Sequence, residues 1–223
     1  MKTPNFMEIK NMYADELFAG LYNLSTADIE KSLMEDTLDV TGKPSVFIVE
    51  RKMRLPMFAA DFYHFIYKKG RIPTQQEFID YYQDSNSDYL AKVLVNDDFK
   101  SGLVGRLCRT YPSLVRDIHL FMLMREQGFD VEFNLENDLF GKVDILVLVG
   151  DVWYGLKLRV KTRNSKMYAD LKDGRGAVDL GYEPIELLMD LDKGRSLNTQ
   201  KDSIKLYDDK AIDYIKSHIM SED

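Results

Sequence analysis

Residues 142–162 read KVDILVLVGDVWYGLKLRVKT and contain two stretches of strand-forming residues. The first stretch, 142–149, is apolar apart from Lys142 and one internal charge, Asp144. The second stretch, 152–162, alternates apolar residues with tryptophan, glycine and basic residues. Gly150-Asp151 stands between them and is typical of a two-residue hairpin turn. The segment therefore predicts two neighbouring antiparallel strands.

The segments on either side of this hairpin predict a mixed α/β domain. Helical spacing of apolar residues predicts helices, whereas alternation of apolar and polar residues predicts strands. The predicted elements are a helix over 113–127 with Ser113 as its N-cap, strands over 129–135, 142–149 and 152–162, a short helix from Asn164, a strand over 184–190 and a terminal helix over 208–218. This α-β-β-β-α-β order with an end helix predicts an α/β fold of mixed α+β type.

The first half of the chain predicts mainly helices. Apolar residues recur at helical spacing over 9–24, and 57–69 is rich in aromatic residues. Thr74 stands three residues before Glu77, which is the spacing of a capping box. Thr110-Tyr111-Pro112 interrupts the helical pattern. We therefore expect a mostly helical region over 1–110 and an α/β core over 111–223.

The net charge is −7, from 30 basic and 37 acidic side chains, which argues against a protein that coats nucleic acid by bulk charge. The basic residues are unevenly placed, because 157–175 holds seven of them against two acidic ones. This run is either a local surface that faces phosphate or an ordinary solvated strand and helix.

Asp144 is the most informative residue of the hairpin. Strand alternation places it on one face with Leu146 and Leu148, and antiparallel pairing brings it near Gly155 to Lys157. A carboxylate in such a place is unfavourable unless it is paired or holds a cation. The carboxylate and the lysine could bind a divalent ion and a phosphate. A plain cross-strand ion pair is the alternative.

The element order, with Gly141-Lys142-Val143-Asp144 on one strand and Gly155-Leu156-Lys157 on the next, resembles the PD-(D/E)xK nuclease superfamily, which has the restriction-endonuclease-like fold. The resemblance covers 113–190. It implies that Asp144 binds Mg²⁺ or Mn²⁺ and that Lys157 orients water and stabilises charge. The second acid of the family's motif would stand at Gly155, which has no ligand atom.

Another element would then have to supply the missing carboxylate. Glu132 on the first strand is the candidate that we assign to the metal with Asp144, and Asp117 and Glu126 on the preceding helix are further candidates. Asp144, Lys157 and Glu132 are thus the predicted catalytic residues. The predicted nucleic-acid contacts are Arg159, Lys161, Arg163 and Lys172.

Two functions remain open. The first is a phosphodiesterase that uses Mg²⁺ or Mn²⁺ to process nucleic acid, DNA rather than RNA. The second is a catalytically dead nuclease-fold protein that grips nucleic acid or a partner protein, for example in viral or mobile-element defence and counter-defence. The single cysteine, Cys108, and the lack of an apolar run of about 20 residues predict a cytoplasmic protein with no membrane partner, and an oligomer is possible.

Overall fold

The computed structural model describes residues 21–133, 143–160 and 182–219. They form two compact units. Unit 1 contains the residues up to Arg116 together with Leu197–Ile204, and unit 2 contains Asp117–Ser196 and the residues from Lys205 onward. Helices and a mixed sheet together make this an α/β protein of mixed type, as expected. Among the described helices, none has the length and apolar character that a bilayer crossing requires.

Unit 1 is helical, in agreement with the sequence. Ser25 and Thr74 each cap a helix through a complete capping box, with Asp28 and Glu77 as the acidic partners. The aromatic segment forms a helix whose buried side chains include Phe62 and Tyr63, so it is core. The elements are η1 (Leu21–Asn23), α3 (Thr26–Glu35), the π-helical turn η2 (Ile48–Lys52), α4 (Phe58–Lys69), α5 (Gln75–Ser85), α6 (Ser87–Val93) and the first part of α7 (Asp97–Glu126).

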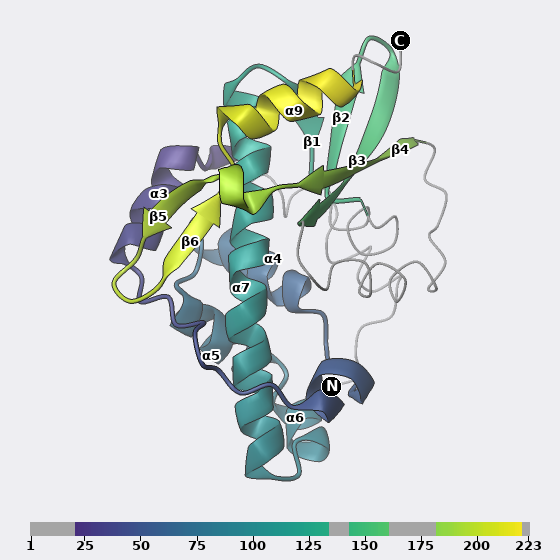
Figure 1. The fold of residues 1–223 in the computed structure, drawn as a ribbon. Helices are drawn as coiled ribbons and strands as arrows, with labels where there is room; N and C mark the ends of the chain where they lie inside the picture. Colours follow the sequence, from purple (N-terminus) through teal and green to yellow (C-terminus); the bar gives the residue numbers. More distant parts are fainter. Residues whose placement is uncertain (1–20, 134–142, 161–181, 220–223) are drawn as a thin grey trace. The chain divides into compact units, whose positions relative to one another are not determined.

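Unit 2 is built around a four-stranded sheet of order β1-β2-β3-β4 (Figure 1). The strands are β1 (Asp130–Glu132), β2 (Ile145–Val149), β3 (Val152–Val160) and β4 (Glu183–Met189). The first three strands pair antiparallel, and β4 is parallel to β3. All four lie within predicted strands or one residue from them. The helix expected from Asn164 lies outside the described residues.

The C-terminal part also contains a hairpin that the sequence pattern did not predict. It consists of β5 (Arg195–Asn198) and β6 (Ser203–Leu206), after the short turn η4 (Leu191–Lys193). The chain then forms α9 (Asp209–Ile219), close to the predicted terminal helix. Helix α9 buries Ile212, Ile215 and Ile219 and packs near β4.

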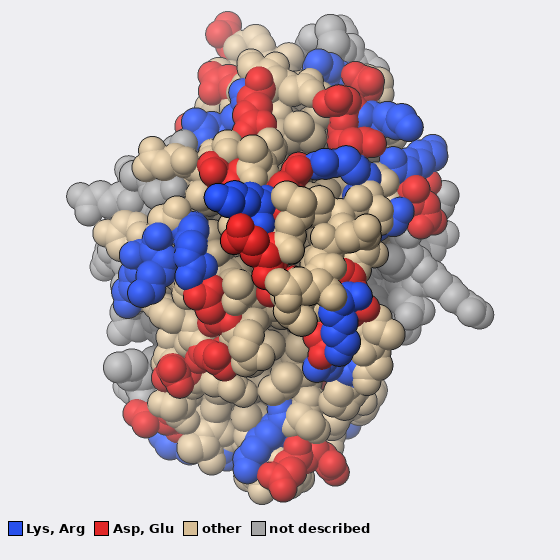
Figure 2. All heavy atoms as spheres, turned by 90° about the vertical axis from the view of Figure 1, so that its left-hand side faces the viewer, with Lys and Arg blue, Asp and Glu red and all other residues tan. Residues whose placement is uncertain are grey.

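Charged side chains of both signs lie on the surface. On the face drawn in Figure 2, Lys and Arg side chains occur in small groups beside Asp and Glu side chains. Some form ion pairs, such as Arg71 with Glu77 at 2.6 Å and Lys100 with Asp97 at 3.1 Å. An anionic ligand would therefore need a local cationic site, since the charge of the whole chain does not attract it.

The predicted helix start at Ser113 is wrong. Helix α7 runs without interruption from Asp97 to Glu126 and contains Pro112. Proline has no N–H, so the carbonyl oxygen of Cys108, four residues earlier, loses its ordinary helical partner. The side-chain amide of Gln75 replaces that partner, because its Nε2 donates a hydrogen bond to the Cys108 oxygen at 3.1 Å. A side chain distant in sequence thus allows the helix to pass through a proline.

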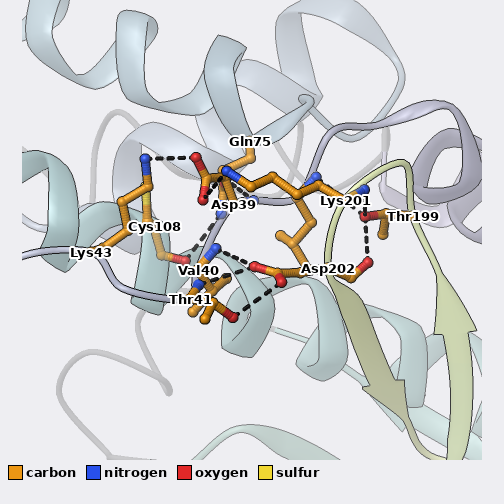
Figure 3. Close-up of polar contacts among 10 residues, drawn as sticks. Asp39, Val40, Thr41, Lys43, Gln75, Cys108, Thr199, Lys201 and Asp202 are labelled. Carbon is orange, nitrogen blue, oxygen red and sulfur yellow. Dashed lines mark hydrogen bonds and ion pairs between the residues drawn. The ribbon is translucent and has the colours of Figure 1, made fainter.

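Gln75 belongs to a buried polar network at this point (Figure 3). Its Oε1 accepts a hydrogen bond from the Asp39 backbone N–H at 2.8 Å, and its own backbone N–H donates to the Asp36 carboxylate at 2.8 Å. The Tyr111 hydroxyl donates to the same carboxylate at 3.1 Å. Burial and then the Asp36 charge raise the pKa of Tyr111 well above its ordinary value, so this hydroxyl remains a donor.

The tip of the β5–β6 hairpin completes unit 1. The Asp202 carboxylate accepts hydrogen bonds from the backbone N–H groups of Val40 at 2.8 Å and Thr41 at 3.0 Å (Figure 3). The Asp39 carboxylate pairs with Lys43 at 2.8 Å and Lys201 at 2.9 Å. Hydrogen bonds from the backbone N–H groups lower the pKa of Asp202, so this carboxylate stays charged. The tip is therefore tied to the 36–43 segment by backbone and side chain.

Replacing Gln75 by leucine should destabilise the protein most when Pro112 is present. The Gln75→Leu variant leaves the Cys108 carbonyl and the Asp39 N–H without their partners, and we expect its free energy of unfolding to fall by about 2–3 kcal/mol. In a Pro112→Ala background the alanine N–H can bond to Cys108, so the loss should shrink by about 1 kcal/mol. Urea denaturation of the four proteins measures this coupling, and equal losses in both backgrounds would contradict the account.

Asp61 in α4 should make stability depend on pH. Burial raises its pKa from 3.8 to about 6, while a hydrogen bond from Asn86 at 2.8 Å acts in the opposite direction. Because the folded state holds the proton more tightly, stability falls as the pH rises from 4 through 6. We expect Asp61→Asn to raise the free energy of unfolding by about 2 kcal/mol at pH 7.5 and to change it little at pH 4. The exposed Asp84→Asn variant is the control, and a gain that does not vary with pH would argue against this role.

Candidate functional site

The sheet of unit 2 has two unlike faces. One face carries Tyr154, Leu156, Ile185 and Leu187, all buried, and Phe121 of α7 packs against Phe133 just after β1, with ring centroids 5.8 Å apart. Pairing across the strands places a different set on the other face, namely Glu132, Leu146, Gly155, Lys157, Arg159, Pro184, Glu186 and Leu188. This second face, called here the charged face, is the predicted site.

Asp144 does not lie inside a strand, as the sequence predicted, but immediately before β2, which begins at Ile145. Its backbone N–H donates to the Leu156 carbonyl at 2.9 Å. Its carboxylate oxygen Oδ2 accepts the backbone N–H of Leu158 at 2.5 Å. The half-buried Asp144 carboxylate thus accepts a β3 hydrogen bond that the backbone carbonyl of a neighbouring strand would ordinarily accept. This hydrogen bond of the Asp144 carboxylate is therefore made to a backbone N–H, that of the residue after Lys157.

Lys157 and Arg159 are half-buried on β3, and β4 supplies an acid next to them. Lys157 lies opposite Glu186 in the parallel pairing. Arg159 forms an ion pair with Glu186, with Nε 3.1 Å from Oε1. No sequence pattern points to Glu186, because the register between β3 and β4 cannot be read from strands that are separated by a long connection. The cations of the charged face are thus partly neutralised.

Gly155 is where the resemblance would place the second acid, and the structure leaves no room for one. A Cβ atom on Gly155 would lie 2.6 Å from Cδ2 of Tyr182 and 2.9 Å from Cγ2 of Val143. Tyr182, which precedes β4, therefore covers the glycine. No pattern in the sequence pointed to Tyr182, because its position depends on the fold after residue 160.

The described residues do not fit the ligand set of a Mg²⁺ or Mn²⁺ site. Glu132 is exposed on β1 and lies two strands away from Gly155 on the same face. Asp117 is half-buried and Glu126 exposed on α7. Within the ranges that the structure describes, no three His, Cys, Asp or Glu side chains come together as a metal site. Mg²⁺ prefers several oxygen ligands in octahedral geometry, so we derive no step through a metal.

Three predicted nucleic-acid contacts, Lys161, Arg163 and Lys172, lie outside the described residues. Arg159, the fourth predicted contact, is described, and it forms the ion pair with Glu186. Cys108 is buried, and burial raises its thiol pKa, so it is core and not a nucleophile.

A separate hollow of about 430 Å³ lies in unit 1, lined by residues of α3 and of the turn after α4. Its lining includes the charged residues Asp28, Lys31, Glu35 and Arg71. No predicted site residue lines it. Since both signs of charge are present, the hollow favours no one class of ligand.

Gly155→Ala should destabilise the protein through Tyr182. Alanine is ordinarily better than glycine within a strand, but here the new methyl group meets the tyrosine ring, so we expect a loss of about 1–3 kcal/mol. In a Tyr182→Ala background the loss should shrink, while the close contact with Cγ2 of Val143 remains. Thermal and urea denaturation of the single and double variants test this, and an unchanged loss without the ring would refute the packing described above.

Comparison of the chain with protein-family models, with curated proteins and with solved structures found no match.

Proposed function

We propose that this chain is a nucleic-acid-binding protein with a restriction-endonuclease-like core whose charged face has lost the metal site. The observation that carries the proposal is the ring of Tyr182 over Gly155, with Lys157 and Arg159 following on the same strand face. The face keeps cations suited to phosphate, whereas the place of an essential acid is closed.

The sheet supports the core topology. Three antiparallel strands followed by a parallel fourth agree with the α-β-β-β-α-β order. A parallel pair requires a crossover connection of a dozen or more residues, usually a helix. The connection from 161 to 182 is long enough for the helix expected from Asn164.

The charges support local binding of phosphate. Lys157 and Arg159 are half-buried, and Arg159 is paired with Glu186. Long cationic side chains commonly bury their stems and keep the charged end in water, which suits contact with phosphate. The basic run continues along the chain through Lys161, Arg163 and Lys172. DNA is our preferred ligand over RNA, and the proposed location is the cytoplasm.

A metal-dependent phosphodiesterase is the second candidate. It is favoured by Glu132, which occupies the same face as Gly155, and by Asp144, whose carboxylate lies beside the backbone next to Lys157. In that case Asp144 and Glu132 would have to be joined by further ligands, because the described residues alone do not form a Mg²⁺ or Mn²⁺ site. A chain that grips a partner protein in place of nucleic acid, or assembles as an oligomer, is the remaining alternative.

A binding and cleavage experiment separates these candidates. We expect the wild type to bind labelled DNA in EDTA without cutting it in Mn²⁺, and Lys157→Ala to weaken binding about tenfold, because a phosphate contact is lost. Lys210→Ala is the matched control, because Lys210 is an exposed residue of α9. Gel shift and cleavage assays across salt concentrations measure both properties. Cutting that Asp144→Asn abolishes would establish the second candidate, and binding equal in Lys157→Ala and wild type would refute the first.

A further inference from the structure

Unit 1 carries an exposed aromatic ring and two exposed cations on the segment 44–54, and one of the cations, Lys52, lies over the ring. Phe47 is 65% exposed, and Ile48 next to it is 44% exposed. The Lys52 ammonium group lies 5.6 Å from the centroid of the Phe47 ring. The side chains of Lys52 and Arg54 are exposed. We call Phe47, Lys52 and Arg54 the Phe47 patch.

The backbone behind this patch is held firmly against α7. Gly105 lets the chain approach closely, because a Cβ there would lie 2.1 Å from the Pro44 carbonyl oxygen. Arg109 donates to the same oxygen at 3.0 Å. Arg106 donates to the Val49 carbonyl at 2.6 Å, and the Tyr89 hydroxyl donates to the carbonyl of Arg54. Contacts from α6 and α7 thus fix the backbone of the segment, whereas the side chains of the patch are exposed.

The segment is also locally positive on an acidic protein. From 44 to 54 it holds three basic residues and one acid, Glu50. That acid is engaged by Arg109 and lies 3.9 Å from Arg106 of α7. It therefore does not neutralise Lys52 or Arg54. Within the part of the chain that the structure describes, Lys52 and Arg54 form no ion pair, so their charges suit an anionic ligand.

An exposed ring flanked by cations is the arrangement that binds single strands of nucleic acid. Bases stack on an aromatic side chain whatever their sequence, and nearby Lys and Arg contact the phosphates. A duplex keeps its base faces covered, so the ring gains little from it. An apolar protein surface would make good use of Phe47 and Ile48 but would leave the charges of Lys52 and Arg54 without partners.

We propose that the Phe47 patch is a contact site for single-stranded nucleic acid, in which Phe47 stacks on a base and Lys52 and Arg54 bind the adjoining phosphates. This inference rests on the proposed nucleic-acid function and names the strand type that the protein takes. It concerns residues of unit 1 alone and requires no metal and no cleavage.

The test is fluorescence anisotropy of labelled oligothymidine, about 12 nucleotides long to match a typical single-strand site, with the full chain in EDTA. We expect Phe47→Ala to weaken binding about tenfold or more through loss of stacking. The Lys52→Gln/Arg54→Gln variant should weaken it and reduce the slope of log affinity against log salt by about 0.7 for each charge removed. Unlabelled duplex should compete poorly.

The matched control is Tyr67→Ala, because Tyr67 is an aromatic residue of α4 that is 43% exposed and is followed by Lys68 and Lys69. Its binding should equal that of the wild type. Circular dichroism melts verify that each variant is folded, and exposure of Phe47 makes unfolding unexpected.

The outcomes separate this inference from the proposed function. Loss of binding in Phe47→Ala with none in Lys157→Ala would keep the patch and reject the site on the charged face. Equal binding by Phe47→Ala and wild type would overturn the patch. So would duplex competing as well as single strand, or a wild type that ignores the oligonucleotide and self-associates through Phe47 in sedimentation.

Discussion

The hydrogen bond from the Gln75 side chain to the Cys108 carbonyl is the constraint on which unit 1 depends. It permits α7 to continue through Pro112, where a helix would ordinarily kink or end. The same Gln75 bonds to the Asp39 backbone and begins α5, so one side chain connects three elements. Since Gln75 and Asp36 are buried, each polar group in the network must keep a partner. The helix that bears Arg106 and Arg109, and therefore the support of the 44–54 segment, follows from this arrangement.

Local patterns were sufficient to predict most elements but not their relations. The alternation in 142–162 predicted β2 and β3, and the spacing of Thr74 and Glu77 predicted the start of α5. Pro112 was interpreted as a boundary because nothing near it in the sequence shows that a distant amide replaces the missing N–H. The β5–β6 hairpin was missed because its strands are only four residues long and contain few apolar residues.

At the candidate site, too, local patterns predicted the residues on one face of a strand but not the residues that other elements bring next to them. The face shared by Gly155, Lys157 and Arg159 could be predicted, because strand alternation is a local property. Glu186 and Tyr182 could not, since they reach β3 through a parallel pairing whose register is set by the fold. Asp144 was assigned to the interior of a strand, whereas its carboxylate acts as a substitute backbone acceptor at the strand's beginning. A glycine in a strand is thus better understood as a place where another side chain lies close than as a missing ligand.

Unit 1 is not a continuous piece of the chain, because Leu197–Ile204 belongs to it. The amide groups of Val40 and Thr41 receive their carboxylate from Asp202, which is synthesised long after them. Asp202 follows Val40 by 162 residues, so during translation residues 36–43 leave the ribosome with this turn unsatisfied until the β5–β6 hairpin has been synthesised. A proteolytic fragment that stops at Arg116 would lack the Asp202 carboxylate that bonds to Val40 and Thr41. Unit 1 therefore cannot be transferred to another protein as one continuous stretch of sequence.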